Sequence, residues 1–428
     1  MQIIYMLLSI ISVVYLIFKA RKVDYFTIYI FSIIIYYFPA YLGGIYINNF
    51  EYIPISNTTY LILILNLSIN LFIMILYDFT KRKTKFKIYE KTLNNFYDNK
   101  AVFLIAVITL ILNLVSMHLY KGISGNFDKV ALLQDSNRIT EYSKYFSLFI
   151  FVYAFTNRGK HINSIRIIAI ISMVRIFMLG HRSFLVIGII CIAFVFLENK
   201  NVKNILEILT RYKKFVIIAI VFLVFIFFVK NVFAAFMDGN YELVISRLSD
   251  KNYYIKTLLQ SEPNAILNNL DSVVKYNMKY DLVSYFLVIF SASIPFLGSE
   301  IMNALNLKTF EYLLQINFNS QFDEGIGLGS TFLGECFSTG GLFFVILICI
   351  LVGIMIIFIQ KINSRISSPI VKTWLIIFLT YTTFYISRNS FVFILVSSRA
   401  YLYIVIVTLI LKNIIKGIYK KFGTKIYI

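Results

Sequence analysis

Long apolar runs separated by short polar stretches are the main pattern of this chain. Runs of roughly 17–25 residues recur, and each is long enough to cross the hydrocarbon core of a bilayer as an α-helix. We predict about eleven membrane spans, at residues 1–18, 25–46, 59–77, 101–119, 144–156, 165–180, 183–197, 215–232, 337–359, 371–387 and 390–411. The pattern predicts an all-α, polytopic membrane protein that forms a single integral membrane domain over residues 1–428.

Composition supports a membrane protein. Hydrophobic residues make up 59% of the 428 residues, charged residues only 14%, and the mean hydropathy is +0.79. A soluble domain has about 45–50% apolar and about 25% charged residues. The first apolar run, Gln2–Phe18, lacks a basic leader and an evident small-residue cleavage site. It therefore indicates a retained span, not a cleaved signal peptide.

The net charge is +20, and the basic residues are concentrated in every second connection between the predicted spans. By count, about 26 of the 41 Lys and Arg residues lie in the connections 19–22, 81–100, 158–166, 200–214, 361–372 and 412–425. This positive-inside bias predicts an outside N-terminus and a cytoplasmic C-terminus. It also explains the positive charge without a nucleic-acid partner, although such loops could instead bind anionic lipid.

Two segments on the predicted outer side are long. One covers residues 120–142, and the other, which we call the outer loop, covers residues 233–336. The outer loop contains an apolar stretch at about 282–297. Counting this stretch as a full span would place every later basic connection outside. We therefore predict an interfacial or re-entrant helix there.

The stretch Phe322–Gly341 concentrates acids, glycines and hydroxyls just before an apolar run. Asp323, Glu324 and Glu335 are candidate general bases, because a positioned carboxylate can remove the proton from an attacking sugar hydroxyl. Glu335 is the preferred candidate, since it stands at the start of a span. The alternative is an ordinary acid at a helix start that interacts with the helix dipole. For Asp323 and Glu324 the alternative is a solvated turn.

Arginines near or within the membrane form the second group of candidates. Arg182 and Arg388 lie in short turns between apolar runs, Arg175 lies about ten residues into its span, and Arg399 about nine residues, or roughly 13 Å, into the last span. Charges at this depth are unfavourable by about 2.5–3.5 kcal/mol, so they indicate a function unless they reach the interface. Several guanidiniums on one side would suit a phosphate-bearing lipid. His181 could hydrogen-bond the substrate, and the alternative is a structural role.

No metal site or cofactor is expected. The cysteines Cys191, Cys336 and Cys349 show no metal-ligand spacing, and the three histidines are far apart along the chain. Arginines can stabilise a leaving pyrophosphate without a metal ion. The segment Gly325–Gly329 resembles a dinucleotide fingerprint only superficially, because no βαβ unit surrounds it.

Four motifs resemble those of the O-antigen and capsule repeat-unit polymerases of the Wzy type. They are the turn at Gly180–Ser183, the proline segment Ser293–Pro295, the glycine-rich stretch Gly327–Glu335 followed by Gly340, and the turn at Ser387–Ser390. The arrangement of about eleven spans with one dominant outer loop also resembles this family, so the likeness covers nearly the whole chain.

The resemblance implies a metal-independent glycosyltransferase with the C-type integral-membrane fold, located in the bacterial plasma membrane. Its substrate would be undecaprenyl-pyrophosphate-linked oligosaccharide, which it would polymerise into O-antigen or capsular polysaccharide at the outer face. Glu335, Arg182 and Arg388 are then the predicted catalytic residues. The predicted substrate-binding residues are Arg399, His181, Asn389, Ser330, Asp323, Glu324 and Arg175. Membrane lipid, a chain-length regulator and a flippase are the expected partners.

Two other functions fit the same architecture. An O-antigen ligase would use the same donor but transfer finished chains to a lipid core. A flippase or transporter for the same lipid would perform no chemistry, but such folds usually contain paired repeats or broken helices in both halves. The sequence shows neither feature.

Overall fold

The computed structural model describes residues 1–18, 23–46, 52–81, 96–119, 138–178, 181–200, 204–214, 239–259, 262–294, 297–318 and 331–422, with isolated positions between 202 and 236. Within these ranges the chain is almost entirely helical. The prediction of a helical, polytopic membrane protein is confirmed. The β-structure found among the described residues is a short two-stranded hairpin.

Helices make up nearly all of the described residues. In chain order they are α1 (Gln2–Phe18), α2 (Tyr25–Tyr36), η1 (Phe38–Leu42), α3 (Asn57–Lys81), α4 (Phe96–Leu119), α6 (Arg138–Thr156), α7 (Ile162–Met178), α8 (Arg182–Asn199), α9 (Ile205–Arg211), α12 (Tyr241–Ser249), α13 (Lys251–Leu259), α14 (Glu262–Lys275), α15 (Leu282–Ser293), α16 (Gly298–Ala304), α17 (Phe310–Phe318), α18 (Phe332–Asn363), α19 (Pro369–Thr380), η4 (Tyr381–Tyr385) and α20 (Phe391–Phe422).

Five of the described helices are long and apolar enough to cross a membrane, namely α3, α4, α8, α18 and α20. Three shorter apolar helices, α1, α2 and α15, are also present in the described part of the chain. The total of about eleven spans stays a prediction. Most of the predicted span at 215–232 lies outside the described residues.

The predicted span at 25–46 is not one continuous helix. Helix α2 ends at Tyr36, and the 3-10 turn η1 follows with Pro39 near its start. Proline lacks the N–H that the next helical turn would need, so the α-helix cannot continue through it. Gly43 then turns the chain with φ of 82° into strand β1 (Gly44–Tyr46), which pairs antiparallel with β2 (Tyr52–Pro54).

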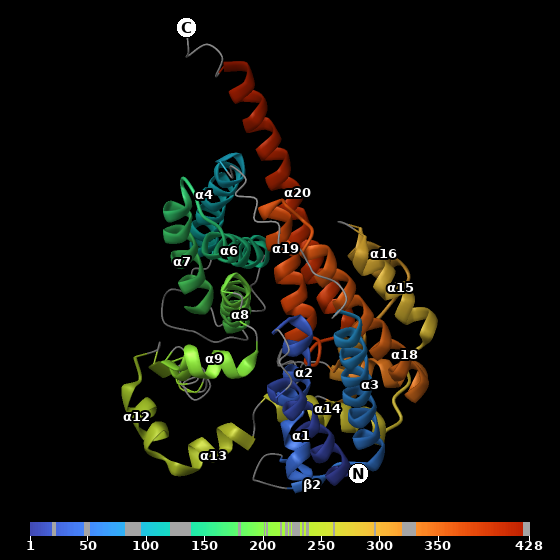
Figure 1. Cartoon of the computed structure of the whole chain (residues 1–428). Helices are drawn as coiled ribbons and strands as arrows, with labels where there is room; N and C mark the ends of the chain where they lie inside the picture. Colours follow the sequence, from blue (N-terminus) through green and yellow to red (C-terminus); the bar gives the residue numbers. More distant parts are fainter. Residues whose placement is uncertain are drawn as a thin grey trace.

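Two clusters of buried hydrophobic side chains hold the helices together. One joins α1, α2, α3, α14, α17 and α18, and the other joins α4, α6, α7, α8, α19 and α20. In Figure 1, α20 rises between α4 and α6 on one side and α3 and α18 on the other, and its last turns extend beyond these helices. Because α19 and α20 contribute side chains to both clusters, they connect the two halves of the molecule.

Helix α18 is broken near its start. Gly340 and Gly341 have non-helical backbone angles, and Gly341 has φ of 65°, which favours glycine. The break removes the usual helical donor for the Ser338 carbonyl, which instead accepts a 2.9 Å hydrogen bond from the Tyr280 N–H. Thus the first two turns of α18 are fastened to the segment that precedes α15.

Helices α15 and α16 form a hairpin that packs against α20. The two ends of this hairpin lie together, because the Tyr280 hydroxyl donates to the Lys308 carbonyl at 2.9 Å. Gly298 starts α16 so close to α15 that a Cβ there would lie 2.3 Å from the Ser291 carbonyl oxygen. The hairpin therefore turns sharply, with its tip beside α20.

Candidate functional site

Arg388 lies at the centre of a polar cluster between the end of η4 and the start of α20. Its Nη1 donates to the Tyr385 hydroxyl at 2.6 Å, and its guanidinium carbon lies 4.9 Å from the centre of the Tyr385 ring. The Tyr36 hydroxyl also contacts the guanidinium. Its Nη2 forms an ion pair with Glu262, the first residue of α14. Burial would lower the pKa of Arg388, but Tyr385 and Glu262 more than offset this, so the pKa is raised and the group stays charged.

A π-helical turn helps to place Tyr385 in this cluster. Residues Tyr381–Tyr385 leave the regular α-helical spacing of α19, and such turns often occur at functional sites. The turn is closed by a hydrogen bond from the Asn389 side-chain amide to the Tyr385 carbonyl. Asn389, predicted to bind substrate, therefore has at least one structural contact.

The two arginine-bearing turns meet at Tyr385. The Ser183 side chain hydrogen-bonds the Tyr385 hydroxyl, which in turn accepts from Arg388. Arg182 is the first residue of α8 and His181 is its N-cap, so both stand next to this junction in the chain. Arg182 also lies within electrostatic range of Tyr253 in α13. The structure thus brings the two predicted turns together.

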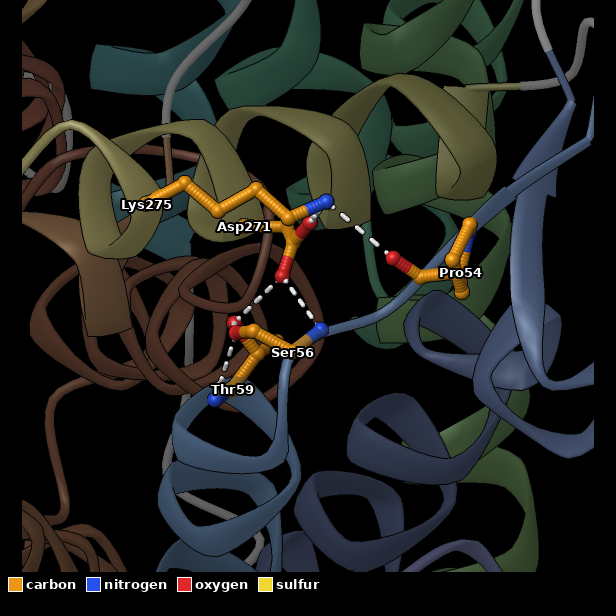
Figure 2. A network of polar contacts seen from close by, with 5 residues as sticks. All are labelled: Pro54, Ser56, Thr59, Asp271 and Lys275. Carbon is orange, nitrogen blue, oxygen red and sulfur yellow. Dashed lines mark hydrogen bonds and ion pairs between the residues drawn. The ribbon is translucent and has the colours of Figure 1, made fainter.

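Helix α14 presents Glu262 to Arg388 and is itself anchored to the start of α3 (Figure 2). The buried Asp271 carboxylate accepts from the Ser56 N–H at 2.9 Å and from the Thr59 hydroxyl at 2.8 Å. Lys275 pairs with Asp271 at 2.6 Å and donates to the Pro54 carbonyl at 3.1 Å. These contacts satisfy donors at the start of α3 and hold α14 in place.

Glu335 lies fully buried in the first turn of α18 and contacts the start of α20. Its Oε2 accepts from the Phe391 N–H at 2.8 Å, while Oε1 has no hydrogen-bond partner among the described residues. Glu311 of α17 approaches the same helix end, where its Oε1 accepts from the Ser390 hydroxyl at 2.8 Å. Burial raises the pKa of Glu311, and the bonds from Ser390 offset part of this rise. Two carboxyl groups thus bind adjacent residues at the N-terminus of α20, where the helix dipole favours negative charge.

Arg399, the ninth residue of α20, binds the tip of the α15–α16 hairpin. Its Nη1 donates to the carbonyls of Ala292 at 2.6 Å and Ile294 at 2.8 Å, which end α15. A cation at a helix C-terminus is favourable because it meets carbonyls that lack helical partners. These contacts give Arg399 a role in holding the hairpin, whereas its predicted part in substrate binding stays a prediction.

Arg175 belongs to a different group of helices. It lies in the last turn of α7, where its guanidinium donates to the Asn113 side-chain carbonyl and, at 2.7 Å, to the Ser116 hydroxyl of α4. Asn113 also donates to Ser147 of α6 at 3.3 Å. None of these contacts joins Arg175 to the Arg388 cluster.

Three predicted site residues, Asp323, Glu324 and Ser330, lie outside the described residues. Across the part of the chain that is described, no group of three or more His, Cys, Asp or Glu side chains could hold a metal ion. The three cysteines are buried and unpaired with one another.

Four residues of this site were not predicted from the sequence: Tyr36, Glu262, Glu311 and Tyr385. Glu262 and Glu311 stand in the first turns of outer-loop helices, and their partners lie far away in the chain. The tyrosines occur in apolar runs that contain many other aromatic residues. A scan for acids at predicted helix starts would have found the two glutamates, but nothing would have marked these two tyrosines.

Comparison with known proteins decides the family. The family model described as O-antigen polysaccharide polymerase Wzy matches residues 1–421. The chain belongs to the Wzy family. Neither a curated protein nor a solved structure matches it. Members of the Wzy family polymerise O-antigen repeat units from lipid-linked oligosaccharides in membranes, which agrees with the apolar helices and confirms the resemblance found in the sequence.

Proposed function

We propose that this Wzy-family chain polymerises undecaprenyl-pyrophosphate-linked oligosaccharide repeat units at the outer face of the bacterial plasma membrane. The observation that carries the proposal is the Arg388 cluster. In it a partly exposed guanidinium is fixed where the turn before α8, the turn before α20 and the outer loop meet. Arg388 would bind the pyrophosphate, with Arg182 beside it, and no metal ion would be needed.

The reaction needs an acceptor hydroxyl, a leaving pyrophosphate and a base. The hydroxyl oxygen of the incoming unit attacks the anomeric carbon of the growing chain. The bond from that carbon to the pyrophosphate oxygen breaks, and undecaprenyl pyrophosphate leaves with the bonding electrons. The hydroxyl proton passes to a carboxylate, for which Glu335 is our candidate because its Oε1 is not engaged by any described residue.

We also propose that α15 and α16 form a re-entrant hairpin within an outer loop at 233–336. The two ends of the hairpin meet at Tyr280 and Lys308, while its tip contacts Arg399, roughly 12 Å along α20 from that helix's start. Its apolar side chains Phe286 and Phe290 are exposed and would face lipid. Arg399 donates to two carbonyls at the end of α15, those of Ala292 and Ile294, and backbone acceptors at membrane depth need such partners.

Substitution of Arg388 tests the proposed function. In a strain that lacks the chromosomal gene, Arg388→Ala should abolish long polymer while single lipid-linked repeat units remain. Arg388→Lys should also fail, because an ammonium cannot engage Tyr385 and a phosphate with the planar geometry of guanidinium. The measurement is the length distribution of carrier-linked glycan on a gel.

Arg211→Ala is the matched control. Arg211 also carries a positive charge, but its side chain is 60% exposed and pairs only loosely with Glu207 one turn away in α9. This variant should produce full-length polymer. Full-length polymer from Arg388→Ala would contradict the proposal, whereas long carrier-linked polymer that is not passed on in the deletion strain would indicate a ligase instead.

A further inference from the structure

The acid that neutralises Arg388 in the structure comes from the outer loop. Glu262 pairs with Nη2 of Arg388, while Nη1 is held by the Tyr385 hydroxyl. The Arg388 side chain is 29% exposed and that of Glu262 is 37% exposed, so neither is fully enclosed by the described residues. A carboxylate therefore covers the Nη2 edge of the guanidinium, which the Tyr36 hydroxyl also contacts.

Glu262 can leave this edge without disturbing the fold. Helix α14 is fastened at Asp271 and Lys275, more than two turns away from Glu262, by its contacts with the start of α3 (Figure 2). Tyr385, in contrast, is part of the buried π-helical turn. Rotation of the Glu262 side chain alone would break its ion pair with Nη2, and Arg388 would keep its contacts with Tyr385 and Tyr36.

The chemistry of the pair favours exchange with a pyrophosphate. An ion pair exposed to this extent is weak, because water screens it and both side chains lose rotamer freedom. A pyrophosphate carries more negative charge than a carboxylate and offers several oxygens in the geometry that guanidinium binds best. We infer that Glu262 is an exchangeable counter-ion of Arg388, which yields to the pyrophosphate of the lipid-linked substrate and returns when undecaprenyl pyrophosphate leaves. This inference rests on the proposed function of Arg388.

An exchangeable counter-ion would affect both the affinity for the substrate pyrophosphate and the rate at which undecaprenyl pyrophosphate is released. Without it, the substrate would no longer compete with a carboxylate, so its pyrophosphate should bind more tightly. The product carries the same group and should then leave more slowly. Glu262→Gln should therefore lower both KM and kcat for polymerisation, whereas the loss of a purely structural pair would not tighten binding.

Calorimetric titration of purified full-length protein with inorganic pyrophosphate provides the test. Glu262→Gln should bind pyrophosphate roughly three- to tenfold more tightly than the unsubstituted protein. Glu262→Ala should shift affinity in the same direction, which guards against an effect peculiar to glutamine. Arg388→Ala should lose most of the binding, and the double variant Glu262→Gln, Arg388→Ala should behave like Arg388→Ala alone.

Glu242→Gln is the matched control. Glu242 is exposed in the first turn of α12, as Glu262 stands in the first turn of α14, and its removal changes the net charge of the outer loop equally. Its effect on pyrophosphate affinity should be small. If Glu262→Gln changes affinity no more than Glu242→Gln does, or weakens binding, the counter-ion inference is wrong while the anion site stands. If Arg388→Ala binds pyrophosphate normally, the proposed site itself fails, and the inference fails with it.

Discussion

At the scale of single residues, the two carboxylate oxygens of Glu335 have different surroundings. One carboxylate oxygen satisfies the Phe391 N–H at the start of α20, and the other has no partner among the described residues. The first role is capping and needs only an acceptor oxygen. The second would be proton removal and needs a carboxylate. A substitution that keeps an acceptor and removes the base separates them.

Glu335→Gln should reduce the polymerisation rate by about 10²–10⁴-fold and leave thermal stability unchanged, because the amide oxygen can still accept from Phe391. Glu335→Ala should lose the activity and also about 0.5–2 kcal/mol of stability, since the Phe391 N–H would lose its acceptor. Thermal unfolding and polymer formation are measured on the same samples. Normal polymer from Glu335→Gln would assign Glu335 to capping alone.

At the scale of elements, the position of the α15–α16 hairpin depends on a close approach at Gly298. A Cβ at this position would lie 2.3 Å from the Ser291 carbonyl oxygen and 3.2 Å from Nη1 of Arg399. The backbone must therefore shift if any side chain is added. The same shift would move the carbonyls of Ala292 and Ile294 away from Arg399.

Gly298→Ala should destabilise the protein by about 1–3 kcal/mol, as expected for overpacking at a site that cannot relax. Thermal unfolding in detergent is the measurement. Gly417→Ala is the control, because nothing lies within 4 Å of a Cβ at Gly417 within α20. There alanine should be neutral or stabilise by up to about 1 kcal/mol through its higher helix propensity. Equal effects at both glycines would exclude a tight hairpin turn.

At the scale of the whole molecule, the predicted orientation can be tested by thiol labelling. The three native cysteines are buried, so they should add little background. With the outer loop outside, cysteines at Glu242 and at Tyr276, which is 73% exposed, should react with a membrane-impermeant maleimide in intact cells. Cysteines at Arg211 and Lys416 should react only after permeabilisation. Labelling of Lys416→Cys in intact cells would contradict the predicted orientation, because it would place the C-terminal end of α20 outside.

Much of the helical architecture could be predicted because it depends on local information. A run such as Leu342–Ile359 must satisfy its backbone hydrogen bonds within itself once water is excluded, so it forms a helix whatever surrounds it. The turns that carry Arg182 and Arg388 were recognisable for the same reason, as polar residues between such runs. Where prediction was wrong, at residues 25–46, a single proline ends the helix and a hairpin replaces its last part.

The sequence by itself therefore determined that this protein is helical, lies in a membrane and belongs to the Wzy family. Only the tertiary structure decided which side chains meet: Glu262 with Arg388, Ser183 with Tyr385, Glu335 with the start of α20, and Arg399 with the end of α15. The physical reason is that helix formation and burial in lipid are set by composition along a short stretch. The partners of a charged group depend instead on how distant helices pack, which no local pattern specifies.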